Sequence, residues 1–184
     1  MKGKEHMIVG TTATATMGIG FLLTNTISSV IYLVPLILGG FIGSYMPDID
    51  SHNSKARQFF NKFIVILIIA LVIGYMLGMA LSIDNIISFL NKHWDEYFPY
   101  ILFFELVILG KLSPHRMFTH KWFGTILFCF SVYLIGNIYL TLGFSMGYIL
   151  HIVCDRFSPK GKKLKFFEFK LPCRNTKNKI TICW

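Results

Sequence analysis

Four short stretches of the sequence concentrate side chains that suit metal binding and hydrolysis. Histidines and aspartates recur in these stretches, which are separated by long apolar runs. They are His6, Asp48, Asp50, His115, His120, His151 and Asp155. Imidazole and carboxylate groups are suitable ligands for zinc, manganese or iron, and an aspartate can bridge two ions that lie close together. These residue types therefore indicate a site for one or two divalent cations, with zinc favoured.

Spacing relates the carboxylates and one histidine to each other. His151 and Asp155 are four residues apart, so on a helix they share one face and can hold one ion, or pair with each other. Asp48 and Asp50 follow Pro47, which favours a non-helical start. In an extended stretch residues i and i+2 point the same way, which predicts that both carboxylates face one site. Capping of the next helix by these aspartates is the alternative.

The stretch from 113 to 121 combines two histidines with an arginine. His115 and His120 are five residues apart, a spacing that suits a loop followed by the start of a helix. A cation would repel metal ions, so we expect the Arg116 guanidinium to bind an anionic substrate through its planar fork, or else to anchor the helix end. Thr119 is a candidate cap of the following helix. Ser54 is a candidate for positioning a ligand.

The composition predicts an integral membrane protein. Of the 184 residues, 54% are hydrophobic and 15% are charged, and the mean hydropathy is +0.58. A crossing needs about 20 mostly apolar residues. Six segments are candidates: 7–23, 30–46, 63–83, 97–112, and two within the run 122–154, divided near 136–143. The fold class expected is therefore an all-α polytopic helix bundle with about six transmembrane helices.

The distribution of charge predicts the orientation of this bundle. Six crossings place both termini on one side, together with the loops 47–62 and 113–121, which carry six lysines and arginines in and around them. The opposite side carries mainly acids. The positive-inside rule then puts both termini in the cytoplasm of a multi-pass protein of the inner or plasma membrane. All four polar stretches consequently fall at the cytoplasmic ends of helices, at one level of the membrane.

The chain divides into a transmembrane metal-site domain, 1–157, and a basic cytoplasmic tail, 158–184. Nine of the 18 lysines and arginines lie from Arg156 onward, against one acid. Beside so much membrane, we expect this tail to bind anionic lipid rather than nucleic acid. The segments "LKFFEFKLP" and "NKITICW" suggest a short hairpin against the cytoplasmic face. The sequence leaves the oligomeric state open.

Three further polar residues fall outside the predicted site. We expect His52 to be solvated between charged loop residues and His93 to lie at the opposite interface. Glu105 falls inside an apolar segment, where a carboxylate is costly and indicates a partner or a functional role.

The motifs also resemble a known family. "PDID" followed by a serine, "HRMFTH" and "GYILHIVCD" occur in the order typical of the YdjM-like inner-membrane metal-dependent hydrolases, with His6 ahead of a small-residue helix and "SPKGKKL" after the last aspartate. That family is distantly similar to the zinc-dependent phospholipase C and single-strand nuclease group. The resemblance covers the chain from His6 to about Leu164. It implies metal ligation by all seven histidines and aspartates named above, although Lys121 stands where the family more often has serine.

Together these features predict a metal-dependent hydrolase acting on a phosphoester, or another anionic and lipid-associated group, at the cytoplasmic face. Metal ions would lower the pKa of a bound water from 15.7 toward about 7. Asp48 or Asp50 is then the candidate general base, and Arg116 would stabilise charge on the phosphoryl oxygens. The alternative is a protein that handles or senses metal ions without hydrolysis. Transport sites tend to lie near the membrane midplane, whereas here all the candidate ligands lie at helix ends.

Overall fold

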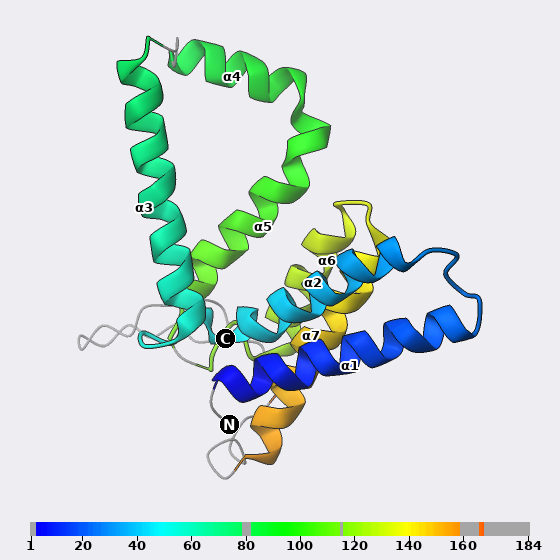
Figure 1. The fold of residues 1–184 in the computed structure, drawn as a ribbon. Coiled ribbons are helices and arrows are strands. Elements are labelled where there is room, and N and C mark those ends of the chain that lie inside the picture. The colour runs from blue at the N-terminus through cyan, green and yellow to red at the C-terminus, as the bar shows by residue number, and fades with distance from the viewer. Residues whose placement is uncertain (1–2, 79–81, 115, 159–165, 168–184) are drawn as a thin grey trace.

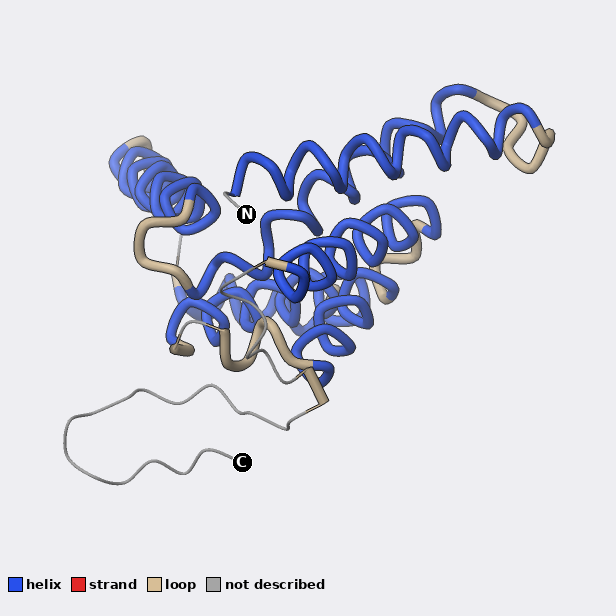
Figure 2. The backbone as a smooth tube through the Cα atoms, turned by 90° about the horizontal axis from the view of Figure 1, so that it is seen from below, coloured by secondary structure: helices blue, strands red, loops and turns tan. Residues whose placement is uncertain are grey.

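The computed structural model describes residues 3–78, 82–114, 116–158 and 166–167, and within these ranges the regular structure is all helical (Figures 1 and 2). Seven α-helices follow one another, with two short 3₁₀ helices beside α2. Their bounds are α1 Gly3–Leu23, η1 Val30–Tyr32, α2 Leu33–Tyr45, η2 Met46–Asp50, α3 Lys55–Met76, α4 Ile83–Lys92, α5 Trp94–Leu112, α6 Trp122–Tyr133 and α7 Ile138–Phe157. The all-α prediction is confirmed for the described residues. The expected hairpin of the tail lies outside them.

Four helical stretches in the described ranges are long and apolar enough to cross a membrane: Lys4–Leu23, Val30–Asp50, Lys55–Met76 and Ile138–Phe157. Two of the six expected segments do not reach this standard. Helix α5 carries acids in its first turn and Glu105 further along. Helix α6 has 12 residues, or about 18 Å at 1.5 Å per residue, against a hydrocarbon core of about 30 Å. The six-crossing topology therefore remains a prediction.

Two boundaries differ from expectation for local reasons. Helix α3 starts at Lys55 rather than near residue 63, because the Ser54 hydroxyl caps it by accepting from the Arg57 amide at 3.1 Å. A separate helix, α4, follows it and is capped by Ser82. The apolar run 122–154 divides into two helices as predicted, and Gly136 in the connection has a φ of +82°, which glycine adopts without steric cost.

Helices α1, α2 and α7 form the tightest packing in the structure. Glycines on α2 and α7 lie against the backbone of the facing helix: a Cβ added at Gly39, Gly43 or Gly143 would collide with main-chain atoms of the other helix. Small residues allow two membrane helices to approach closely and gain dispersion contacts along their length. This contact fixes α7 relative to α2 and therefore fixes the polar groups at the ends of both helices.

A second layer supports those ends. Phe118 of the α5–α6 loop packs with Phe128 of α6 and with Tyr148 of α7 in a buried apolar cluster. Helices α3 and α4 extend away from the remaining helices as an arm (Figure 1), and α5 returns from it to pack on α6, where Phe103 meets Phe128. At the base of the arm Arg57 donates to the carbonyl of Lys111 at 3.1 Å. The loops at this base connect to η2 and to the start of α6.

Candidate metal centre

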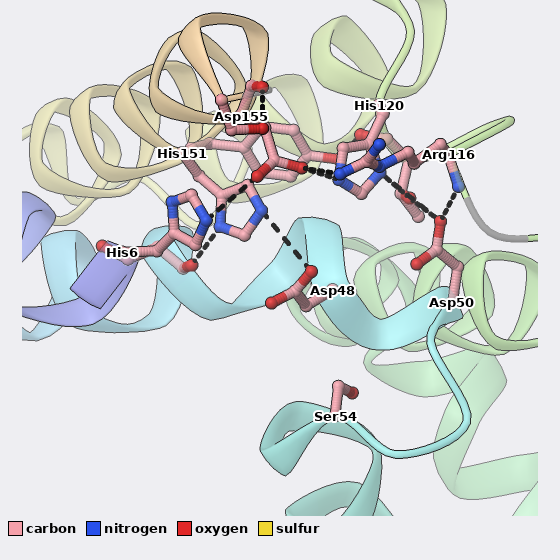
Figure 3. A network of polar contacts seen from close by, with 12 residues as sticks. His6, Asp48, Asp50, Ser54, Arg116, His120, His151 and Asp155 are labelled. Atoms are coloured by element: carbon pink, nitrogen blue, oxygen red, sulfur yellow. Dashed lines mark hydrogen bonds and ion pairs between the residues drawn. The ribbon is translucent and has the colours of Figure 1, made fainter. Parts of the chain in front are cut away.

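Side chains from four parts of the chain meet at one end of the helix bundle (Figure 3). Helix α1 supplies a histidine, η2 two aspartates, the α5–α6 loop an arginine and a histidine, and α7 a histidine and an aspartate. These residues are His6, Asp48, Asp50, Arg116, His120, His151 and Asp155. Six of the seven predicted ligands are thus brought together. The seventh, His115, lies outside the described residues.

Asp155 is the centre of the cluster. Its Oδ1 lies 3.1 Å from Nε2 of His6, and its Oδ2 lies 3.6 Å from Nε2 of His120. The same Oδ2 accepts a hydrogen bond from Nη2 of Arg116 at 3.3 Å. Each oxygen of this carboxylate therefore faces a different histidine.

His151 connects the two sides of the cluster. Its ring stacks on that of His6 with centroids 4.0 Å apart. Its Nδ1 lies 2.7 Å from the Ser44 carbonyl oxygen. Because a carbonyl only accepts, Nδ1 carries the proton and Nε2 keeps its lone pair. That Nε2 points toward Oδ1 of Asp48 at 3.6 Å.

The two aspartates of η2 point in different directions, which corrects the prediction of an extended stretch. Pro47 lies in the first turn of a 3₁₀ helix rather than in an extended segment. At three residues per turn, positions i and i+2 are about 240° apart. Asp48 accordingly faces His151. Asp50 instead faces the α5–α6 loop, where its Oδ2 accepts from the Arg116 amide at 2.7 Å and from the Thr119 hydroxyl at 2.9 Å.

Most of the cluster is shielded from solvent. His6, His120, His151, Asp50 and Asp155 are at most 4% exposed. In the described part of the chain, two groups of three residues place potential ligand atoms within 4.8 Å of one another: His6 with His151 and Asp155, and Asp48 with His120 and His151.

The donor atoms fit a divalent cation. Among the described residues neither Nδ1 of His6 nor Nε2 of His151 has a hydrogen-bond partner, although both atoms are buried. A buried polar atom without a partner is costly, and a buried carboxylate needs a cation or several donors. A cation held by these imidazoles, with Asp155 as the charged ligand, would give both nitrogens a partner.

Two weaker predictions concerned the hydroxyl groups of Ser54 and Thr119. Ser54 caps α3 and thereby replaces Asp48 and Asp50 in that role. Thr119 does not cap α6, whose N-cap residue is Lys121; its hydroxyl is directed to Asp50. These two serine and threonine assignments were therefore wrong.

Two polar residues lie outside the cluster. His52 is exposed, as predicted. Glu105 is also exposed on α5.

Two contributions to the site were not singled out from the sequence. The Ser44 carbonyl is a main-chain group with no sequence signature. Tyr148, fully buried, donates its hydroxyl to the Thr119 carbonyl at 2.6 Å and so supports the residue next to His120. Its position three residues before His151, on the same helix face, was the available signal.

A multi-pass helical membrane protein with a buried histidine and aspartate cluster at its helix ends is the class that this fold and site define. The chain belongs to the YdjM inner membrane protein family, which it matches over residues 1–175. No curated protein and no solved structure matches it. The family assignment agrees with the resemblance based on "PDID", "HRMFTH" and "GYILHIVCD".

Proposed function

We propose that this protein is a membrane-embedded, metal-dependent hydrolase of a phosphoester or a related anionic, lipid-associated group. One observation carries the proposal: buried imidazoles and carboxylates from α1, η2, the α5–α6 loop and α7 converge within ligand distance of one another. Three histidines and a shared carboxylate are a donor set suited to zinc, with manganese or iron as alternatives. Such a cation, when bound, supplies Lewis acidity and a nucleophilic water at neutral pH.

The residues that would hold the cation are His6, His120, His151, Asp48 and Asp155. The first two histidines reach Asp155 through Nε2, while the Ser44 carbonyl holds His151 in the tautomer whose Nε2 can ligate. Burial of these groups excludes bulk water from most of the cluster. It also strengthens their electrostatic interactions.

Asp48 and Arg116 are the residues proposed to act on substrate and water. The side chain of Asp48 is 21% exposed, against 6% for Asp155, so Asp48 is the carboxylate that a water can approach. It is the candidate general base. The side chain of Arg116 is 28% exposed, and its guanidinium lies beside Asp155. Its planar fork suits the oxygens of a phosphoryl group, where it would offset developing negative charge.

The placement of this reaction at the cytoplasmic face is part of the proposal. Support comes from the positive charge of the loops 47–62 and 113–121, which lie at the same end of the bundle as the cluster. The topology is then that of a polytopic protein with both termini in the cytoplasm. The basic residues beyond Arg156 would attract anionic head groups.

The test combines metal analysis with an activity screen. We expect the purified protein to retain a divalent metal, to hydrolyse members of a panel of phospholipids and soluble phosphodiesters, and to lose both properties in His151→Ala. His52→Ala is the matched control, because His52 is exposed and lies outside the cluster. Unchanged metal content in His151→Ala would refute the metal site. Metal loss without any wild-type hydrolysis would favour metal handling, which proteoliposome flux would then measure.

A further inference from the structure

Asp50 differs from the other carboxylates of the cluster in what it contacts. Its neighbours are donors of the α5–α6 loop, and neither of the two three-residue ligand groups in the described part of the chain includes it. We propose that Asp50 is a positioning residue, which orients His120 and holds its loop, rather than a metal ligand or general base. This inference rests on the proposed metal site and assigns Asp50 a role other than the ligation that the family resemblance implies.

The contacts of one oxygen carry the argument. Oδ2 of Asp50 accepts from the Arg116 amide at 2.7 Å and from the Thr119 hydroxyl at 2.9 Å, and it lies 3.4 Å from Nδ1 of His120. Hydrogen bonds from such donors to a buried carboxylate are among the strong ones in proteins. An oxygen already engaged by two donors is poorly placed to ligate a cation as well.

The orientation of His120 follows from the same contacts. Nδ1 of His120 lies 3.1 Å from the Thr119 hydroxyl, which itself donates to Asp50. The hydroxyl proton is used in that bond, so Nδ1–H is the partner that suits both oxygens. Nε2 then keeps its lone pair and points to the interior of the cluster, 3.6 Å from Oδ2 of Asp155.

His151 shows the same arrangement in this site. There the Ser44 carbonyl accepts from Nδ1 at 2.7 Å and leaves Nε2 directed at Asp48. Metal-binding histidines commonly donate their second ring nitrogen to a carboxylate or a main-chain carbonyl, which fixes the tautomer. Asp50 thus has the role for His120 that the Ser44 carbonyl has for His151: it faces Nδ1 and leaves Nε2 for the metal.

The backbone conformation of the loop adds to the argument. Arg116 has a φ of +65°, a left-handed conformation that is strained for a non-glycine residue. The hydrogen bond that the Arg116 amide donates to Asp50 offsets this strain. Asp50 therefore positions both the Arg116 backbone and His120.

The experiment compares Asp50→Asn with Asp48→Asn in the purified full chain, stripped of metal and titrated with Co²⁺. The positioning role predicts that Asp50→Asn binds as many ions as wild type, with unchanged visible absorption bands and an affinity about 10–100-fold weaker. Asp48→Asn should alter the bands or the number of ions. Asp84→Asn, an exposed aspartate on α4, is the matched control and should leave the titration unchanged.

A second readout does not depend on metal. In ¹⁵N-histidine NMR of the metal-free protein, with His120 assigned from a His120→Gln variant, we expect the Nδ1–H tautomer. Asp50→Asn and Thr119→Val should each reduce that preference. A wild-type Nε2–H tautomer would overturn the inference, as would a band shift or a lost ion in Asp50→Asn. If wild type binds no Co²⁺, the metal site fails, and the tautomer alone decides the role of Asp50.

Discussion

The hydroxyl of Tyr148 provides a sharp test of how the helix bundle supports the α5–α6 loop. Tyr148 is fully buried and donates to the Thr119 carbonyl at 2.6 Å, one residue before His120. Its ring packs on Phe128 and Phe144 at centroid distances of 5.7 and 5.8 Å. Tyr148→Phe keeps these ring contacts and removes the hydroxyl alone. The effect of the substitution can therefore be assigned to one hydrogen bond.

The magnitude follows from what the substitution leaves behind. The Thr119 carbonyl loses a buried donor, which costs about 1–3 kcal/mol, whereas deletion of both partners would be nearly neutral. We expect Tyr148→Phe to lower the free energy of unfolding by that amount, measured by reversible unfolding in detergent mixtures. The same substitution should weaken Co²⁺ binding, because His120 adjoins Thr119. Tyr133→Phe is the control, since Tyr133 is 58% exposed and should change stability by less than about 0.5 kcal/mol. Equal stabilities of the two variants would refute the reasoning.

Three other predictions address the packing, the cap and the metal. Gly143→Ala should destabilise the bundle, because the new Cβ would meet the Leu36 carbonyl. Gly20→Ala is its control and should be neutral or stabilising by up to about 1 kcal/mol, since the added methyl meets no atom within 4 Å. Chemical denaturation in detergent measures the stability of both variants. Ser54→Ala should cost about 1 kcal/mol through loss of the α3 cap, leaving Co²⁺ affinity unchanged in the same titration. Addition of zinc to 100 times its dissociation constant should stabilise the stripped protein by about 2.7 kcal/mol, an effect that His151→Ala abolishes; equal unfolding midpoints with and without zinc would contradict it.

Much of the site was accessible from the sequence because its residues obey simple geometric rules. Alternation of apolar segments predicted that the ends carrying His6, Asp48, His120 and Asp155 would meet, and the structure brings these residues together. The i and i+4 spacing of His151 and Asp155 predicted their common helix face. These are consequences of helix periodicity and membrane thickness, which act locally.

Other features depend on contacts that local patterns do not encode. The direction of Asp50 depends on a 3₁₀ turn after Pro47, where the sequence favoured an extended stretch. The Thr119 hydroxyl donates to Asp50 from a loop whose backbone is left-handed at Arg116, a conformation that no propensity predicts for arginine. Helix α4 was missed because the search was for long apolar segments, whereas its ten residues mix apolar and polar side chains.

The central claim is that a divalent cation binds within this cluster. Anomalous diffraction from crystals of the full chain, grown with zinc and collected on both sides of the zinc edge, tests it most directly. The account predicts an anomalous peak within ligand distance, about 2.0–2.2 Å, of imidazole nitrogens and carboxylate oxygens among His6, Asp48, His120, His151 and Asp155. Zinc bound only elsewhere on the chain, or no peak at this cluster, would contradict it.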